Sequence, residues 1–173
     1  MTYVYPVFEM ADRLGDADER RSLEAFVDYY RAVMVNKLRG LSEEDARKRL
    51  VPSDTTLGGL VKHLTNAEHR WFELFLLRKS WEPQTAEERR AEFTMTPEET
   101  VDGIIAAYEA QHERSRSSAA GFELDDRAVR EGHEYTLRWI YLHMIDEIAR
   151  HAGHADILRE QIDGSIGDGR LVL

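Results

Sequence analysis

Four side chains that can bind a metal ion or carry a proton follow one face of the stretch from residue 137 to 162. They are His143, Glu147, His151 and His154. The stretch contains no proline and one glycine, and its apolar residues recur at steps of three and four, which predicts a helix. At roughly 100° per residue, the four polar side chains fall within an arc of about 80°. Neighbours such as Glu147 and His151 are one turn apart, so such a pair can bind one ion.

The apolar stripe of this predicted helix indicates where the polar face points. It consists of Leu137, Ile140, Met144, Ile148, Ala152 and Ala155. An apolar stripe of this kind faces the core of a globular protein. Because the His and Glu side chains lie directly beside it, we expect them to be aimed toward the interior.

A further ligand is expected from an earlier helix. His63 lies at the edge of the apolar face of a helix predicted over about 57–77. With Glu147 and His151 it completes two imidazoles and one carboxylate, the ligand set of a zinc site that keeps one position open. His143 can replace His151 in the pair, and His154 can orient a ligand or contact a substrate. A second interpretation stays open, in which His63 is a hydrogen-bonded core residue and the others belong to a solvated face.

Composition narrows the classes of protein to consider. The 173 residues suit one domain, with 42% hydrophobic and 32% charged residues. No run reaches the roughly 18 apolar residues of a membrane span, and the N-terminus lacks a signal-peptide pattern, so we expect a cytoplasmic protein without a membrane role. The net charge of −10 argues against nucleic-acid binding. The absence of cysteine excludes disulfides, a thiolate nucleophile and a zinc site built on sulfur.

Helical periodicity and capping residues predict an all-α protein, a four-helix bundle with long connections. Thr136 caps the last helix and Gly164 ends it, and Thr96-Pro97-Glu98-Glu99 predicts the start of the third helix. A short helix opens at Ser42, and a strand-like piece lies within 121–135. The long helices are predicted over about 18–39, 57–77, 96–118 and 137–162. We expect a connection over 79–95, an N-terminal arm over 1–17 and a flexible tail over 165–173.

Other catalytic constellations are missing from the sequence. It contains no Gly-x-Gly-x-x-Gly, phosphate-binding loop, Gly-x-Ser-x-Gly or His-Glu-x-x-His. The repeated Glu-x-x-His pairs of di-iron bundles are also missing, because Glu147 and His151 are four residues apart. The remaining histidines stand apart from these sets and are predicted to be surface or core residues: His69, His112 and His133.

Two segments resemble the DinB-like metalloprotein bundles. LGGLVKHLTNAEHRWF is similar to their second helix, and LRWIYLHMIDEIARHAGHADILREQIDG is similar to the last helix of their DUF664 branch. The resemblance covers about residues 20–165 and implies a DinB/YfiT-like four-helix bundle. Most such proteins use one His from the second helix and a His-x-x-x-His pair from the last. Here the pair is Glu147-x-x-x-His151, which resembles mycothiol-dependent maleylpyruvate isomerase and implies the ligands His63, Glu147 and His151.

The resemblance also implies a reaction class. Relatives are transferases or isomerases that use mycothiol or similar small thiols. We therefore expect a divalent metal, Zn²⁺ first and Ni²⁺ or Fe²⁺ next, which activates a small-molecule thiol toward an electrophilic substrate. His154 or His143 would handle the proton. The alternatives are a hydrolase that uses metal-bound water, or a metal-binding bundle without catalysis. A homodimer is expected from the apolar arm and the aromatic second helix.

Overall fold

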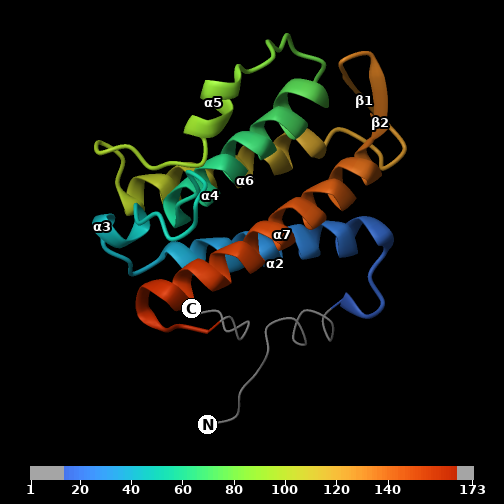
Figure 1. Ribbon diagram of the computed structural model, residues 1–173. Helices are drawn as coiled ribbons and strands as arrows, with labels where there is room; N and C mark the ends of the chain where they lie inside the picture. The colour runs from blue at the N-terminus through green and yellow to red at the C-terminus, as the bar shows by residue number, and fades with distance from the viewer. Residues whose placement is uncertain (1–13, 167–173) are drawn as a thin grey trace.

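The computed structural model describes residues 14–166, most of which lie in helices (Figure 1). The predicted arm over 1–17 and tail over 165–173 fall largely outside these residues. In chain order the elements are α2 (Glu19–Leu38), α3 (Glu43–Ala46), α4 (Leu57–Glu68), the π-helix η1 (His69–Phe75), α5 (Ala86–Ala91), α6 (Val101–Ala119), β1 (Arg127–Arg130), β2 (His133–Thr136) and α7 (Leu137–Asp163).

Four long helices form the bundle, as predicted, with α4 and η1 together making the second (Figure 1). Helices α2 and α7 run in the same direction, because Arg138 pairs with Glu19 at their starts and Arg159 bonds the carbonyl oxygen of Lys37 at their ends. Helices α4 and α6 are parallel too, since Lys62 pairs with Glu99 just before α6. The chain from η1 to α6 must therefore return along the bundle, which explains the long connection.

The predicted apolar stripe of α7 forms the centre of the core. All six of its residues are buried, and they join one cluster of buried apolar side chains. Trp71, Phe72 and Phe75 are also buried within the single chain. The aromatic second helix therefore gives no support to a dimer, and the homodimer stays a prediction.

The second long helix changes its geometry part-way, which the sequence pattern did not predict. The α-helix ends at Glu68, and residues His69–Phe75 form a π-helix. Here the N–H of Leu76 donates to the carbonyl oxygen of Trp71, five residues earlier. The helix predicted to about residue 77 is present to Phe75, but its second part is a π-helix. Seven residues are too few for an apolar pattern to distinguish the two kinds of helical turn.

Two further boundaries differ from the prediction. The connection over 79–95 contains α5, which begins with a capping box between Thr85 and Glu88. Helix α6 is capped by Thr100 rather than Thr96. Glu99 does accept the N–H of Thr96, at 2.7 Å. The helix begins later, at Val101, whose N–H donates to the carboxylate of Glu43 in α3 at 2.9 Å.

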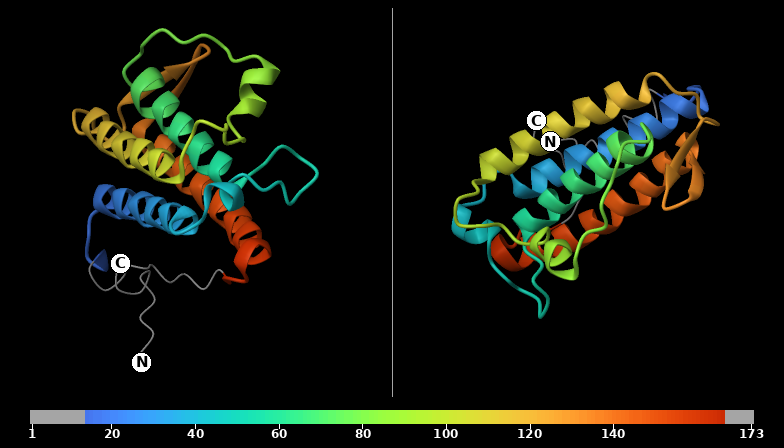
Figure 2. Two further views of the ribbon diagram at one scale, coloured as in Figure 1. Left: turned by 90° about the vertical axis from the view of Figure 1, so that its left-hand side faces the viewer. Right: turned by 90° about the horizontal axis from the view of Figure 1, so that it is seen from above.

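Strands β1 and β2 form an antiparallel hairpin at the end of the bundle where α7 begins (Figure 2). Thr136 ends the hairpin and caps α7 by accepting the N–H of Trp139. Gly164, with φ of 79°, ends the same helix, as predicted. Over residues 14–166, none of the helices combines the length and apolar character that a membrane span requires.

Candidate metal centre

Three side chains from two facing helices converge at one point beside the core. His63 projects from α4, and Glu147 and His151 project from successive turns of α7. Oε1 of Glu147 lies 3.1 Å from Nε2 of His63 and 3.4 Å from Nε2 of His151. One potential ligand atom from each residue lies within 4.8 Å of the other two. The α4 and α7 faces thus bring together the three residues that the sequence singled out.

Two of the three spacings in this group fit a tetrahedral ion. Two ligand atoms at about 2.0–2.1 Å from a tetrahedral zinc ion are about 3.3 Å apart. The two contacts of Glu147, at 3.1 and 3.4 Å, lie close to that value. Among residues 14–166, no other His, Asp or Glu joins this group. Three N and O ligands with no fourth are the donor set of an open divalent-metal site.

The group is screened from solvent by the helices that carry it. The side chains of His63 and His151 are 11% exposed and that of Glu147 is 19% exposed. His63 stands between Leu60 and Leu64, which are fully buried on the same helix. A carboxylate in such surroundings needs a compensating positive charge, which a metal ion supplies.

A second carboxylate orients His63 from behind. Oε2 of Glu92 lies 3.1 Å from Nδ1 of His63, on the side of the ring away from Glu147. Glu92 is itself buried and accepts hydrogen bonds from Arg70 at 2.6 Å and from Gln84 at 2.8 Å. A carboxylate on the second nitrogen of a ligating histidine fixes its tautomer and makes it a stronger ligand. With its N–H turned to Glu92, His63 presents Nε2 to the proposed ion.

The charges of this cluster favour a cation. Burial alone would raise the pKa of Glu92, but hydrogen bonds from His63, Arg70 and Gln84 outweigh it and lower that pKa to about 2. Glu147 accepts hydrogen bonds from His151 and from His63, and these bonds hold its pKa well below the usual range. Burial would lower the pKa of His63, yet its bonds to Glu147 and Glu92 raise it. Two carboxylates thus remain ionised around one imidazole, which is a favourable place for a divalent ion.

A close backbone approach places Glu92 beside His63. The carbonyl oxygen of Phe93 accepts the N–H of Thr56 at 3.0 Å, at the N-terminus of α4. A Cβ added to Gly59 would lie 1.9 Å from that oxygen, so only glycine lets the two backbones come this close. The ring of Phe93 then stacks on His63, with centroids 4.2 Å apart. The first turn of α4 therefore holds the segment that carries Glu92.

The two other histidines of the polar face lie on opposite sides of the group. Nδ1 of His154 is 3.5 Å from Nδ1 of His151, behind the imidazole edge that faces Glu147. The ring of His143 contacts Trp71 and is stacked on Trp139, with centroids 4.8 and 5.0 Å away. Neither residue belongs to the three-residue group.

Comparison with known proteins assigns a family. The family model described as mycothiol-S-transferase matches residues 22–164, a range that includes all three residues of the group and Glu92. The chain belongs to the mycothiol S-transferase family. This assignment confirms the resemblance to DinB-like bundles.

The fold of this mycothiol S-transferase family member also has a solved counterpart. The crystal structure of a conserved protein of locus from Enterococcus faecalis superposes with a TM-score of 0.63 at 14% identity, covering 86% of this chain and 99% of the other. At that identity the likeness concerns the fold alone, and it supports the all-α bundle. No curated protein matches the sequence.

A cavity lies beside α5, next to the three-residue group. It has a volume of about 450 Å³ and is lined by Gln84, Ala86, Arg89, Arg90 and Phe93. Phe93 separates it from His63, on which its ring is stacked. Both arginines are exposed, so this face of the mycothiol S-transferase family member offers guanidinium donors on the same cavity as Phe93.

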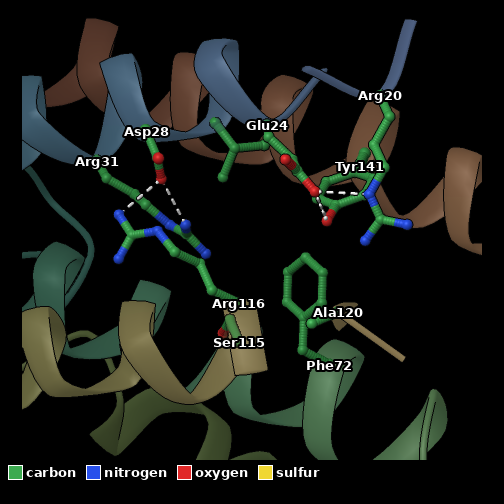
Figure 3. Close-up of a pocket in the computed structure, with 10 residues that line it drawn as sticks. Arg20, Glu24, Asp28, Arg31, Phe72, Ser115, Arg116, Ala120 and Tyr141 are labelled. Carbon is green, nitrogen blue, oxygen red and sulfur yellow. Dashed lines mark hydrogen bonds and ion pairs between the residues drawn. The ribbon is translucent and has the colours of Figure 1, made fainter. Parts of the chain in front are cut away.

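A different cavity, of about 250 Å³, opens between α2, α6 and α7 (Figure 3). None of the three candidate ligands lines it. The polar groups that line it pair with one another (Figure 3). Glu24 accepts hydrogen bonds from Arg20 and Tyr141, and Asp28 forms ion pairs with Arg31 and Arg116. Two aromatic side chains, Phe72 and Tyr141, also line this cavity, whereas Trp71 and Trp139 flank His143.

Sequence reasoning missed Glu92, Arg70 and Gln84. The capping pattern Thr85-x-x-Glu88 could have revealed α5, after which Glu92 follows. Nothing local indicates that Glu92 reaches His63, because the contact spans 29 residues and depends on the approach of Phe93 to α4. The remaining histidines agree with prediction: His112 is buried, whereas His69 and His133 are exposed or partly exposed.

Proposed function

We propose that this protein is a metal-dependent transferase that joins the sulfur of mycothiol, or of a comparable small thiol, to an electrophilic carbon. The observation that carries the proposal is a group of two imidazoles and one carboxylate without a fourth ligand among the described residues, in a chain of the mycothiol S-transferase family. A closed set of four protein ligands would instead be typical of a structural site.

The three residues would hold a divalent ion, zinc first, through Nε2 of both histidines and Oε1 of Glu147. Such an ion favours the anionic form of a thiol that reaches it, because a dication at bonding distance stabilises the thiolate. Glu92 would keep Nε2 of His63 directed at the ion. Its own hydrogen bonds to Arg70 and Gln84 limit its movement, which preserves that orientation.

The thiol would approach from the side of α5. The cavity of about 450 Å³ beside Phe93 is large enough for the polar body of a small cosubstrate. Arg89, Arg90 and Gln84 offer hydrogen-bond donors to that body. Phe93 would separate this polar region from the imidazole of His63 and would limit the access of water to the sulfur.

The reaction transfers one proton and forms one carbon–sulfur bond. The thiol loses its proton, and the sulfur lone pair then forms a bond to the electrophilic carbon. In a displacement, the leaving group departs with its bonding electron pair. In an addition to a conjugated double bond, the electron pair of that bond takes up a proton at the adjacent carbon. Both routes therefore need a protein group that accepts the thiol proton. The addition also needs a group that delivers a proton to the adjacent carbon.

We propose that two histidines handle this proton. Burial lowers the pKa of His143, against the opposing charge of Glu147, so its imidazole is neutral and can accept a proton at neutral pH. His154 is exposed and turns Nδ1 toward His151, which leaves Nε2 for exchange with solvent. We assign proton transfer to these two residues, with His143 on the side of the aromatic residues.

Cobalt substitution tests the proposal without relying on turnover. Cobalt-loaded protein is titrated with mycothiol, with glutathione and with buffer alone, and its absorption spectrum is recorded. We expect a cobalt–sulfur charge-transfer band with mycothiol that disappears in His63→Ala. Formation of the thioether with an aryl halide should follow in zinc-loaded protein and cease after chelation.

The same experiment decides against the proposal if no band forms with either thiol. Hydrolysis of a test ester by the same protein would then indicate that water takes the place of the thiol. Neither a band nor hydrolysis, with the metal retained, would indicate a metal-binding bundle without catalysis.

A further inference from the structure

A cluster of ring side chains extends from the candidate metal centre toward the hairpin. Trp71 of η1 contacts Tyr135, Trp139 and His143, with ring centroids 5.5, 5.1 and 4.8 Å away. His143 and Trp139 are stacked with an interplanar angle of 15°. Trp71 is buried, but Trp139 is 40% exposed. Aromatic faces that remain open to solvent beside buried ones can bind a flat ligand.

Arg130 supplies a positive charge at this cluster, and its ion pair with the carboxylate of Glu131 is long, at 3.8 Å. Its guanidinium lies over the rings of Trp71 and Phe75, 5.2 and 5.4 Å from their centroids. Its Nε is buried and has no hydrogen-bond partner within residues 14–166. The carboxylate of Glu131 is 3.8 Å from Nε, too far for a hydrogen bond. The rest of the guanidinium reaches solvent, since the side chain is 37% exposed, and its N–H groups can donate to an anionic acceptor.

The hairpin fixes Arg130 in this position. Arg130 pairs with His133 across a turn whose two central residues, Glu131 and Gly132, have φ of 50° and 79°. Two residues with positive φ make the tight turn that matches the twist of a hairpin. Arg130 and Ala128 alternate onto the same face of β1, and Ala128 is fully buried against the bundle. The neighbouring Arg127 has the opposite orientation and pairs with Glu134.

The cluster adjoins the candidate metal centre through α7. His143 precedes Glu147 by one turn, a rise of about 6 Å along the helix. Trp139 is one turn further away, toward the hairpin. A flat molecule against Trp139 would therefore extend past His143 toward Glu147. The cavity beside α5 instead adjoins Phe93, which stacks on His63.

We propose that this cluster binds the electrophilic substrate, and that this substrate is a planar conjugated or aromatic molecule that carries a carboxylate. The exposed ring of Trp139 contacts its face, and Arg130 binds the carboxylate through its guanidinium. The reactive carbon then points along α7 toward His63 and Glu147. The assignment of this ligand as the substrate that accepts the thiol rests on the proposed function; the binding of a planar carboxylate does not.

Isothermal titration calorimetry with two matched probes tests the inference. Chelator-treated full-length protein is titrated with 2-naphthoate and with 2-naphthamide, which share the ring system and differ in charge. We expect 2-naphthoate to bind about tenfold more tightly or better, because a hydrogen bond between charged partners is stronger than a neutral one. Arg130→Gln should abolish the difference between the probes. Arg127→Gln, on the other face of the same strand, should preserve it.

Equal affinity of the two probes in the wild-type protein would overturn the inference, as would a preference that survives Arg130→Gln. Should Arg130→Gln fail to fold, as judged by circular dichroism, the wild-type comparison and Arg130→Lys still decide. The lysine variant keeps the charge and should retain part of the preference. Trp139→Leu should lower the affinity for both probes by the same factor.

Kinetics separate this inference from the proposed function. In zinc-loaded protein, 2-naphthoate should raise KM for an aryl electrophile and leave KM for the thiol unchanged. Preference for the carboxylate without any thiol transfer would contradict the proposed function and leave the binding site intact. Thiol transfer without that preference would contradict this inference alone.

Discussion

Oε2 of Glu92 lies 3.1 Å from Nδ1 of His63, although 29 residues separate them in the chain. The opposite nitrogen of the same ring faces Glu147 at 3.1 Å. One imidazole therefore lies between two carboxylates, of which one is a candidate ligand and the other a positioning residue. This arrangement makes His63 the link between the α5 segment and the proposed ion.

Replacing Glu92 by glutamine should weaken metal binding and leave the fold in place. Glutamine keeps the shape but removes the charge that strengthens His63 as a ligand and that balances Arg70. Loss of such a partner lowers metal affinity by about 10–100-fold. Competition with a zinc chelator measures the affinity. Glu87→Gln, on the exposed face of α5, is the matched control and should bind as the wild type does. Equal zinc affinities for the two variants would show that Glu92 does not position His63.

Gly59→Ala tests the backbone approach that carries Glu92. The added Cβ would meet the carbonyl oxygen of Phe93 at 1.9 Å, so the segment must move away from α4. We expect a loss of about 1–3 kcal/mol in the free energy of unfolding, together with weaker metal binding. Gly153→Ala has open space around it and should stabilise α7 by about 0.5–1 kcal/mol. Urea unfolding measures both; an unaffected Gly59→Ala would contradict the described packing.

A buried histidine away from the candidate metal centre should make stability depend on pH. Burial, with the positive charges of Arg31 and Arg116, lowers the pKa of His112 to about 2. The unfolded chain takes up a proton on this residue near pH 6.5 and the folded chain does not. The stabilising contribution of neutral His112 is therefore present above the pKa of the unfolded chain, about 6.5, and is lost progressively as the pH falls below it.

For His112 alone this loss amounts to about 1.4 kcal/mol between pH 7.5 and 5.5. Urea unfolding of the wild type and of His112→Gln at both pH values isolates it, since the other groups titrate alike in the two proteins. Between these two pH values, His112→Gln should lose less free energy of unfolding than the wild type does, and the difference should equal the contribution of His112. Parallel losses in the two proteins would show that folding does not lower the pKa of His112.

Arg89 and Arg90 should affect the thiol rather than the electrophile. If the cavity beside α5 binds the thiol, Arg89→Ala and Arg90→Ala should each raise KM for mycothiol by about three- to tenfold, the equivalent of one hydrogen bond. KM for the electrophile should not change. Arg39→Ala, an exposed arginine that pairs with Glu109, serves as the control. A rise in KM for the electrophile instead would place the thiol elsewhere.

Much of the fold could be predicted because the signals are local. The stripe from Leu137 to Ala155 repeats at helical spacing, and the caps Thr136 and Gly164 mark the ends of α7 by short-range hydrogen bonds and a positive φ. The convergence of His63 on Glu147 and His151 was also predictable, since facing helices of a bundle bring their polar edges together. Their role as ligands remains a prediction.

The rest depends on contacts between distant parts of the chain. Helix α6 begins at Val101 because Glu43 of α3 binds its N–H, which no pattern around Thr96 reveals. The π-helix differs from an α-helix by one residue in each hydrogen-bonded turn, too little to detect in seven residues. Glu92 and Arg130 gain their significance from partners 29 and 59 residues away, His63 and Trp71.

The central claim is that His63, Glu147 and His151 bind one divalent ion. Elemental analysis of protein purified without an affinity tag, compared with a His63→Ala, His151→Ala double variant, tests it most directly. The account predicts about one ion per chain, zinc first, in the wild type and almost none in the double variant. Stoichiometric metal in the folded double variant would contradict it.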